Sequence, residues 1–224
     1  MVGTVTVAAG WSRGILLLLF FVTSSILSRF GHARKTALTR DVVEKDGERD
    51  MWQVLANGGV YFIAAIGALL FPSTIPYSLG AGALAAATAD TWATEIGTYA
   101  GGVPASIISW RRVPPGTSGG ISLFGSLAGI AGALFIAVSV TLAKWPVPFA
   151  AALLGGIAGA LSDSVLGGTI QVRRHCAACN RSTERQVHDC GTKTIHSGGI
   201  EWIDNDVVNF FSTTFGALVA LLAS

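Results

Sequence analysis

Residues 77–99 read YSLGAGALAAATADTWATEIGTY, an apolar stretch rich in alanine and glycine that also carries Asp90 and Glu95. A helix of about 20 residues crosses the roughly 30 Å hydrocarbon core of a bilayer, and this stretch is long enough. Glycine and alanine let helices approach closely in lipid. An acidic side chain within a span costs at least about 2.5 kcal/mol to insert, so it normally faces other helices. The stretch therefore predicts one helix of a transmembrane bundle.

Five further stretches are apolar and long enough, or nearly so, to span a bilayer. The composition agrees, because 51% of the 224 residues are hydrophobic and only 12% are charged, whereas a soluble domain carries about 25% charged residues. With the stretch above, the six predicted spans are 14–28, 52–71, 77–99, 117–143, 147–170 and 207–224. We predict an all-α fold, a polytopic transmembrane bundle of about six helices that forms a single domain over residues 1–224.

The first predicted span is short and follows Arg13, so a cleaved signal peptide is the alternative interpretation. No small-residue cleavage site follows Val22, which favours a retained helix. Residues 1–10 are too short to span a membrane alone. We expect them to be the remnant of a helix truncated upstream.

The basic residues are distributed very unevenly among the loops. All but Arg13 and Lys144 of the 15 lysines and arginines lie in three alternate loops, at 29–51, 100–116 and 171–203. The positive-inside rule places such loops in the cytoplasm. We therefore expect an integral, multi-pass membrane protein with both termini outside.

This topology brings acids from separate helices to the cytoplasmic half of the membrane. Asp90, Glu95 and Asp163 lie within predicted spans. Further acids and amides stand at the cytoplasmic ends of two other spans, at Gln53, Asn57, Asp204, Asn205, Asp206 and Asn209. Carboxylates that lack buried basic partners repel one another unless a cation is bound, and hard oxygen ligands favour Mg²⁺. The alternative is that these groups only form hydrogen bonds between helices.

Residues 110–120 read WRRVPPGTSGG and connect two predicted spans. Thr117 or Ser118 could cap the following helix, whose free N–H groups and dipole would then form an anion site. Arg111 and Arg112 add positive charge. The alternative is an ordinary proline-glycine turn with basic flanks. A lysine-bearing phosphate loop and a protein-kinase signature are both absent from the sequence, so a nucleotide would be held in another way.

The last cytoplasmic loop contains Cys176-x2-Cys179-x8-His188-x-Cys190, which offers four soft ligands on a short polar segment. This spacing suits a tetrahedral structural Zn²⁺. Unliganded thiols are the alternative, whereas an odd number of cysteines on the reducing side argues against a disulfide framework.

Five ordered motifs together resemble a known family. They are FVTSS at 21–25, QVLANG at 53–58, ADTWATEIG at 89–97, VPPGTSGG at 113–120 and DNDVVN at 204–209. They are similar to the multi-pass membrane family that contains transmembrane protein 19 and the chloroplast phytyl-phosphate kinase of tocopherol synthesis. The resemblance covers the chain from about residue 10 onward.

The resemblance implies a lipid kinase that transfers a phosphoryl group from a nucleoside triphosphate, with CTP favoured, to a prenyl or phytyl monophosphate, giving the diphosphate. Such chemistry needs positioning and charge neutralisation more than a strong base. The Mg²⁺ ligands would be Asp90, Glu95, Asp163 and Asp206. The substrate-binding residues would be Asn57, Arg111, Arg112, Gly116, Thr117, Ser118, Arg174, Lys193, Asn205 and Asn209.

The main alternative is a cation- or proton-coupled transporter that uses the same buried acids. Acids are absent from the outer halves of the predicted spans, although a pathway should be lined throughout. A CDP-alcohol transferase is less favoured, because its run of four spaced aspartates is missing. A zinc-dependent scaffold would leave the acids unexplained. We expect no nucleic-acid polymer as a partner, and Gly125-x3-Gly129 and Gly155-x3-Gly159 permit helix packing within the chain or in a homo-oligomer.

Overall fold

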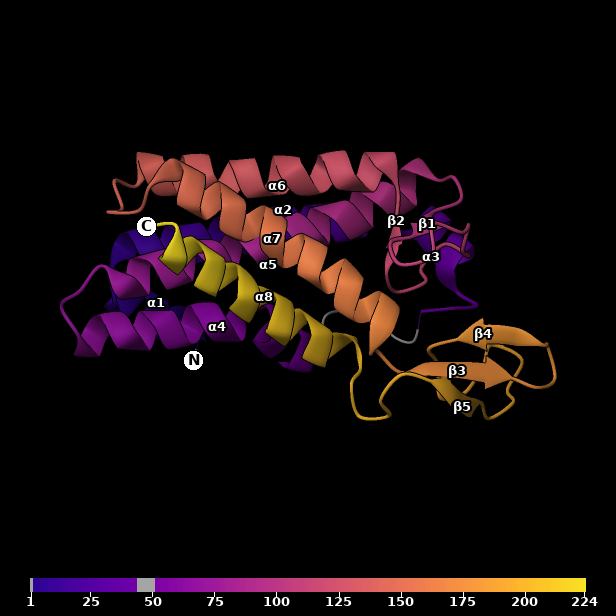
Figure 1. Ribbon diagram of the computed structural model, residues 1–224. Coiled ribbons are helices and arrows are strands. Elements are labelled where there is room, and N and C mark those ends of the chain that lie inside the picture. Colours follow the sequence, from indigo (N-terminus) through magenta and orange to yellow (C-terminus); the bar gives the residue numbers. More distant parts are fainter. Residues whose placement is uncertain (1, 44–50) are drawn as a thin grey trace.

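The computed structural model describes residues 2–43 and 51–224 and shows a bundle of helices with two small sheets at one end (Figure 1). Five of the described helices are long and apolar enough to cross a membrane. They are α2 (Trp11–Arg29), α4 (Met51–Leu70), α6 (Leu123–Leu142), α7 (Phe149–Thr169) and α8 (Asn205–Leu222). The other helices are α1 (Val2–Ala8), α3 (His32–Thr39) and α5 (Ile75–Ala100). The prediction of a mostly helical polytopic membrane protein is confirmed.

The longest helix, α5, is the centre of the bundle, although it is too polar to count among the five apolar spans. It packs against α2, α4, α6, α7 and α8. Every residue from Gly80 to Ala89 is buried. Neighbouring helices therefore cover the small-residue half of α5, and its acidic residues follow from Asp90 onward.

Glycines bring the backbones of α5, α7 and α8 into contact. A Cβ atom added at Gly82 would lie 2.3 Å from the carbonyl oxygen of Gly216, and one added at Gly155 would lie 2.6 Å from the same oxygen. At Gly159 an added Cβ would lie 2.3 Å from the Cβ of Ala86. The glycines of the 155–159 pair therefore pack within the chain.

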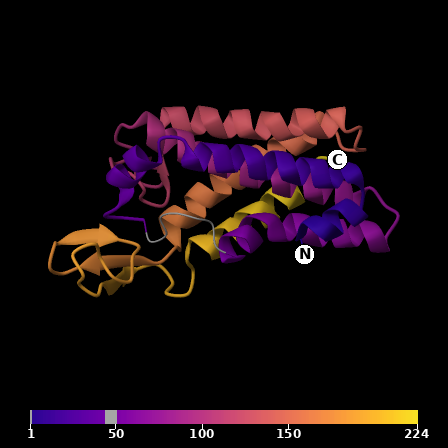
Figure 2. The same ribbon diagram turned by 180° about the vertical axis from the view of Figure 1, so that it is seen from behind.

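The end of the bundle where α5 and α7 begin is closed by aromatic and cationic side chains. The guanidinium carbon of Arg13 lies 3.9 Å from the ring centroid of Tyr77 and 5.2 Å from that of Trp145. The Tyr61 hydroxyl donates a hydrogen bond of 2.8 Å to the Arg13 carbonyl. Seen from behind, α2 runs along the bundle, with α1 folded back beside its first turns (Figure 2).

The opposite end, which we call the loop end, carries α3 and both sheets (Figure 1). Strands β1 (Ala105–Ser106) and β2 (Gly120–Ile121) pair antiparallel. Strands β3 (Arg173–Cys176), β4 (Arg181–Thr183) and β5 (Ile195–Gly198) form an antiparallel sheet in the order β4-β3-β5. The three loops predicted to be cytoplasmic thus share one end, and residues 44–50 of the first loop lie outside the described part. The strands were not predicted.

The prediction that the fourth span begins near residue 117 is wrong. Helix α6 begins at Leu123, and its cap is Ser122, whose hydroxyl accepts a hydrogen bond of 3.1 Å from the Gly125 amide. Thr117 and Ser118 cap no helix. The physical reason is Gly119, whose φ of 76° is incompatible with a right-handed helix.

We predict that Gly82→Leu lowers the stability of the bundle. The new side chain would meet the Gly216 carbonyl in the α5–α8 contact, and overpacking of this kind costs about 1–3 kcal/mol. The measurement is the thermal unfolding midpoint of the purified protein in detergent.

Gly67→Ala is the matched control, because an added Cβ there meets only the Pro76 side chain at 3.6 Å, an ordinary contact. Equal midpoints for Gly82→Leu and the wild type would contradict the tight α5–α8 packing.

Candidate functional site

A cavity of about 620 Å³ opens at the loop end of the bundle. Residues of α2 to α8 toward this end line it, together with the β1–β2 loop. Its polar lining residues include Ser28, His32, Lys35, Gln53, Asn57, Asp90, Thr94, Glu95, Thr117, Ser118, Asp163, Gln171, Glu184, Asp204, Asn205, Asp206 and Asn209. We refer to this space as the acidic cavity.

Two predicted metal ligands, Asp90 of α5 and Asp163 of α7, meet in the acidic cavity. Their carboxyl groups lie close enough to interact directly. The Ser212 hydroxyl of α8 donates a hydrogen bond of 3.1 Å to Asp163 Oδ2. The two acids face each other because the glycines of α7 let it pack closely on α5.

The third predicted ligand, Glu95, has a basic partner that was not anticipated. Lys35 of α3 forms an ion pair with Glu95 and is only 9% exposed at its side chain. The Lys35 ammonium also donates hydrogen bonds to the carbonyls of Leu27, at 2.7 Å, and Ser28, at 2.9 Å. The expectation of acids without a buried base is therefore wrong for Glu95. Its ion pair fixes α3 against the ends of α2 and α5.

An acid that the sequence analysis missed, Glu184, reaches the acidic cavity from the residue after β4. Its Oε1 accepts a hydrogen bond of 3.1 Å from the Ser118 amide, and its Oε2 accepts one of 3.0 Å from Gln171 Nε2. Its charge acts on Asp163. Glu184 stands in a polar segment without a motif, so only the fold of the sheet reveals its place.

The start of α8 and the first turns of α4 add acids and amides to the lining. Asp204 caps α8, because its Oδ1 accepts a hydrogen bond of 3.0 Å from the Val207 amide. Asp206, Asn205 and Asn209 follow on the same segment and line the cavity. From α4, the Asn57 side-chain amide donates a hydrogen bond of 3.1 Å to the Gln53 carbonyl.

All four basic residues that were predicted to bind phosphate lie outside the lining of the acidic cavity. They are Arg111, Arg112, Arg174 and Lys193. The first two are exposed in the hairpin that the bridge of Ala105 with Arg112 closes, and the last two belong to the three-stranded sheet segment. Lys35 and His32 of α3 line the cavity instead. Gly116, Thr117 and Ser118 do line it, as part of a turn in which Gly116 has a φ of 85°.

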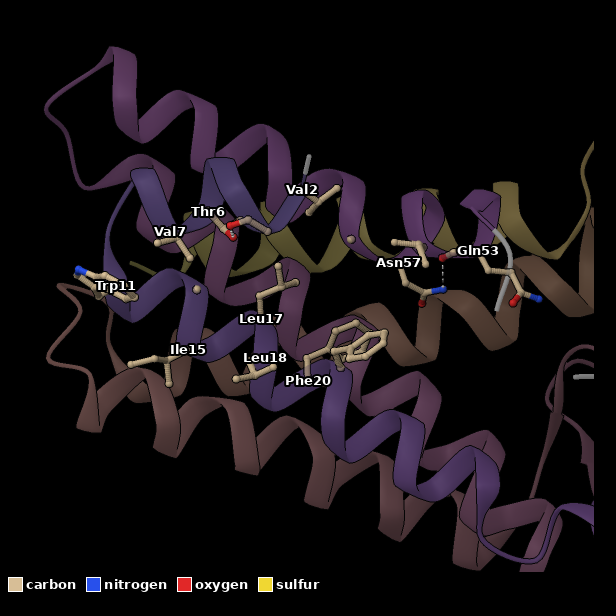
Figure 3. A pocket seen from close by; sticks show the side chains of 15 residues that line it. Val2, Thr6, Val7, Trp11, Ile15, Leu17, Leu18, Phe20, Gln53 and Asn57 are labelled. Atoms are coloured by element: carbon tan, nitrogen blue, oxygen red, sulfur yellow. Dashed lines mark hydrogen bonds between the residues drawn. The ribbon is translucent and has the colours of Figure 1, made fainter. Parts of the chain in front are cut away.

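An apolar groove of about 510 Å³ lies between α1, α2 and α4 (Figure 3). Its lining includes Val7, Ile15, Leu18 and Phe20. Gln53 and Asn57 stand at one end of the groove and also line the acidic cavity. The molecule thus offers an apolar surface that continues into a polar, acidic one.

The four predicted zinc ligands form a separate cluster in the three-stranded sheet segment. Their candidate ligand atoms all lie within 4.8 Å of one another. A hydrogen bond with Thr192 and another with His188 lower the pKa of Cys190 to about 6. A hydrogen bond with Cys190 raises the pKa of Cys179 to about 11. We call these four residues the cysteine–histidine cluster.

These features define a polytopic helical membrane protein with an acidic cavity at one end of its bundle. The sequence model of the integral membrane protein family DUF92 matches residues 1–217, and the chain belongs to this family. The resemblance stated from the motifs is thereby confirmed.

Named relatives cover most or all of the chain. Protein PGR of Arabidopsis thaliana is 30% identical over 100% of this chain and 85% of its own length. The uncharacterized membrane protein MJ0933 of Methanocaldococcus jannaschii is 34% identical over 72% of this chain and 66% of its own. The chloroplastic protein VTE6 of Arabidopsis thaliana is 27% identical over 99% of this chain and 62% of its own. No solved structure matches the chain.

We predict that Lys35→Met destabilises the protein by about 3–5 kcal/mol, because it leaves Glu95 as an uncompensated and largely buried charge. Lys35→Arg keeps the positive charge, so it should lower the free energy of unfolding by less. The measurement is the free energy of unfolding in detergent.

The double variant Lys35→Met/Glu95→Gln tests the cause of this loss. It should recover part of the stability, because the unpaired charge is gone. A double variant whose loss equals the sum of the two single losses would contradict a direct coupling between these residues.

Proposed function

We propose that this protein is an Mg²⁺-dependent membrane lipid kinase that transfers a phosphoryl group from a nucleoside triphosphate, with CTP favoured, to a prenyl or phytyl monophosphate. The observation that carries the proposal is the junction of the apolar groove with the acidic cavity at Gln53 and Asn57. An amphiphile with an apolar chain and a phosphate head matches both parts. The motif resemblance to the family of the chloroplast phytyl-phosphate kinase supports the same reaction class, and the chloroplastic relative VTE6 is 27% identical to this chain.

The charges of the acidic cavity suit a magnesium–phosphate complex. Asp90 and Asp163 present adjacent carboxyl groups, and oxygen ligands of this kind suit Mg²⁺. The ion held by these carboxylates would offset the negative charge of the phosphate groups during transfer. Asp206 would support the ion from α8. Glu95, already paired with Lys35, takes a positioning role in this proposal.

The phosphate groups would be held by amides and backbone rather than by exposed arginines. Asn57, Asn205 and Asn209 line the cavity from two helices. The turn at Gly116–Ser118 adds backbone groups, and its glycine allows close approach. The acceptor is already an anion, so its oxygen attacks without a strong general base.

The acceptor chain would lie in the apolar groove, with its head in the acidic cavity. The groove is mostly apolar and Gln53 and Asn57 stand at its end toward the acidic cavity, so a chain would reach it from the bilayer while its phosphate stays at the loop end. The basic loops at that end favour a cytoplasmic site, where nucleotides are available.

A cation- or proton-coupled transporter remains the second candidate, because the Asp90–Asp163 pair also suits a cation. Its pathway would have to cross the bundle. In the described residues, Arg13 packs on Tyr77 and Trp145 at the end opposite the acidic cavity. A cation would have to pass this positive charge, which favours the kinase.

The proposal predicts diphosphate formation when the purified protein receives Mg²⁺, CTP or ATP, and phytyl, geranylgeranyl or farnesyl monophosphate. Asp90→Asn and Asp163→Asn should each lower turnover at least about 100-fold, because each removes a charge that holds the metal. Turnover is measured by separation of labelled products.

Glu201→Gln, an exposed acid outside the cavity, is the matched control and should keep wild-type turnover. Full turnover in folded Asp90→Asn and Asp163→Asn proteins would refute the metal assignment. If no acceptor reacts and liposomes carrying the protein exchange ions, the transporter is correct.

The groove assignment predicts a chain-dependent effect of Gly58→Leu. An added Cβ at Gly58 meets no atom within 4 Å, and this residue lines the groove, so the leucine fills open space. Displacing two or more CH₂ groups of a bound chain, at about 0.8 kcal/mol each, should raise KM about tenfold or more. The measurement compares KM for phytyl and isopentenyl monophosphate.

Leu69→Phe, on an exposed position of the same helix, is the control for a general effect of bulk on α4. If Gly58→Leu changed the KM of the long and the short acceptor equally, the apolar chain of the acceptor would not lie in the groove.

A further inference from the structure

The three-stranded sheet has almost no apolar core of its own. Of residues 173–198, all of which are described, only Cys176 is a buried hydrophobic residue, and Thr183 and His188 are the buried polar ones. Its strands are three or four residues long. A small sheet without an apolar face is at best marginally stable in water, and such modules commonly depend on a metal. The sheet therefore needs another source of stability.

The cysteine–histidine cluster lies where two tight turns of this segment meet. Cys176 ends β3, and Cys179 follows in the turn toward β4. His188 and Cys190 stand in a second turn, which is closed by hydrogen bonds from the His188 amide to Thr192 and from the Gly191 amide to His188. The two turns come from different parts of the segment, so a group bound between them would cross-link it.

The distances within the cluster are close to those that one metal ion requires, and small side-chain shifts would bring all four ligand atoms into range. The Sγ atoms of Cys176 and Cys190 are 3.6 Å apart, and His188 Nδ1 lies 3.2 Å from the Cys190 Sγ. Tetrahedral Zn²⁺, with bonds of about 2.3 Å to sulfur and about 2.0 Å to nitrogen, requires ligand atoms about 3.5–3.8 Å apart. Cys176 and His188 are buried. His188 Nε2 is also buried and has no hydrogen-bond partner among the described residues.

We propose that Cys176, Cys179, His188 and Cys190 bind one structural Zn²⁺ that holds the three-stranded sheet together. Three thiolates and one imidazole are a common donor set for closed structural zinc sites. The proposal stands apart from the kinase function, because it concerns the fold of the sheet.

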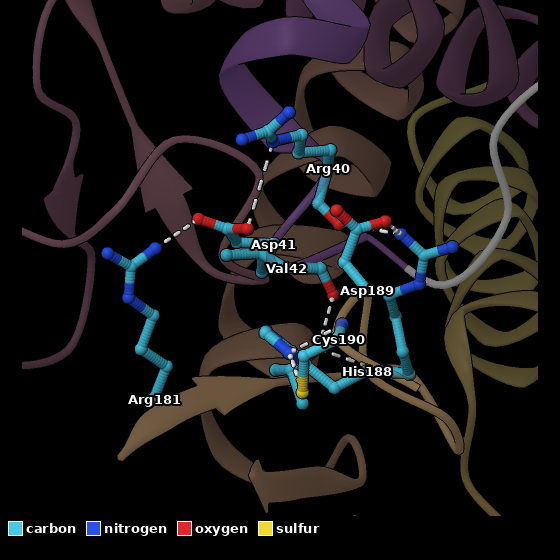
Figure 4. Close-up of polar contacts among 9 residues, drawn as sticks. Arg40, Asp41, Val42, Arg181, His188, Asp189 and Cys190 are labelled. Atoms are coloured by element: carbon cyan, nitrogen blue, oxygen red, sulfur yellow. Dashed lines mark hydrogen bonds and ion pairs between the residues drawn. The ribbon is translucent and has the colours of Figure 1, made fainter. Parts of the chain in front are cut away.

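The zinc-bound sheet would also position a residue of the acidic cavity. Arg181 forms an ion pair with Asp41 (Figure 4). Arg185 Nη1 donates a hydrogen bond of 2.6 Å to the Arg40 carbonyl. Between these two arginines, the Glu184 amide donates a hydrogen bond of 2.9 Å to the Val42 carbonyl. These contacts dock the sheet on the segment after α3 and hold the Glu184 carboxylate against Ser118 and Gln171.

The first test measures metal content in the full-length protein purified in detergent. We expect about one zinc per chain by mass spectrometry of the metal, and visible bands of tetrahedral thiolate coordination after replacement by Co²⁺. His188→Asn should lose most of the zinc. His196→Asn is the matched control, because His196 lies in the same sheet outside the cluster. Wild-type protein without zinc, equal zinc in both variants, or a disulfide between Cys176 and Cys190 would overturn the proposal.

A second test needs no variant and no activity. Wild-type protein is stripped of metal with a chelator and treated with trypsin, which cleaves after Arg181 and Arg185. We expect cleavage at these sites to be at least about tenfold faster in the stripped protein, and to slow again when zinc is restored. The helical signal in circular dichroism should not change, since the bundle does not contain the ligands. Equal cleavage rates in both forms would overturn the structural role.

Discussion

The structure depends on the burial of α5 by close helix packing. The hydrocarbon core of a bilayer offers no water to a carboxylate, so polar side chains on a spanning helix must be covered by protein. Gly82, Gly155 and Gly216 allow α5, α7 and α8 to touch backbone to backbone. This contact buries the Gly80–Ala89 stretch of α5 and brings Asp90, the next residue, close to Asp163. The close packing of small residues therefore also sets the position of the acids.

The acids at the loop end fall into two kinds, which differ in their partners. Glu95 is neutralised by Lys35 and joins three helices, so it stabilises the rim of the cavity. Asp90 and Asp163 have each other and Ser212 as neighbours, an arrangement that a cation would complete. The apolar groove meets this arrangement at Asn57. An apolar groove that leads to carboxylates able to hold a cation suits a lipid phosphate, and this arrangement supports the proposed kinase.

The three-stranded sheet connects the membrane bundle to a segment that lies outside it. Glu184 directly follows strand β4, and its side chain lines the acidic cavity. A shift of the sheet would therefore move this carboxylate within the cavity. The proposed zinc would make this connection rigid without taking part in phosphoryl transfer. A stable sheet matters because it keeps the Glu184 carboxylate within hydrogen-bonding distance of the Ser118 amide.

The sequence by itself determined the helical membrane class, five of the apolar spans to within a few residues at most ends, and the gathering of acids near the basic loops. Hydropathy, charge bias and the spacing of Cys176, Cys179, His188 and Cys190 are local properties, so they can be read without a structure. The prediction failed at the glycine turn before α6, where φ rather than hydropathy sets the helix boundary. Only the tertiary structure decided that Lys35 pairs with Glu95 and that Glu184 lines the same cavity as Asp163. Such partners are far apart in the chain, and their meeting depends on how helices and sheet pack together.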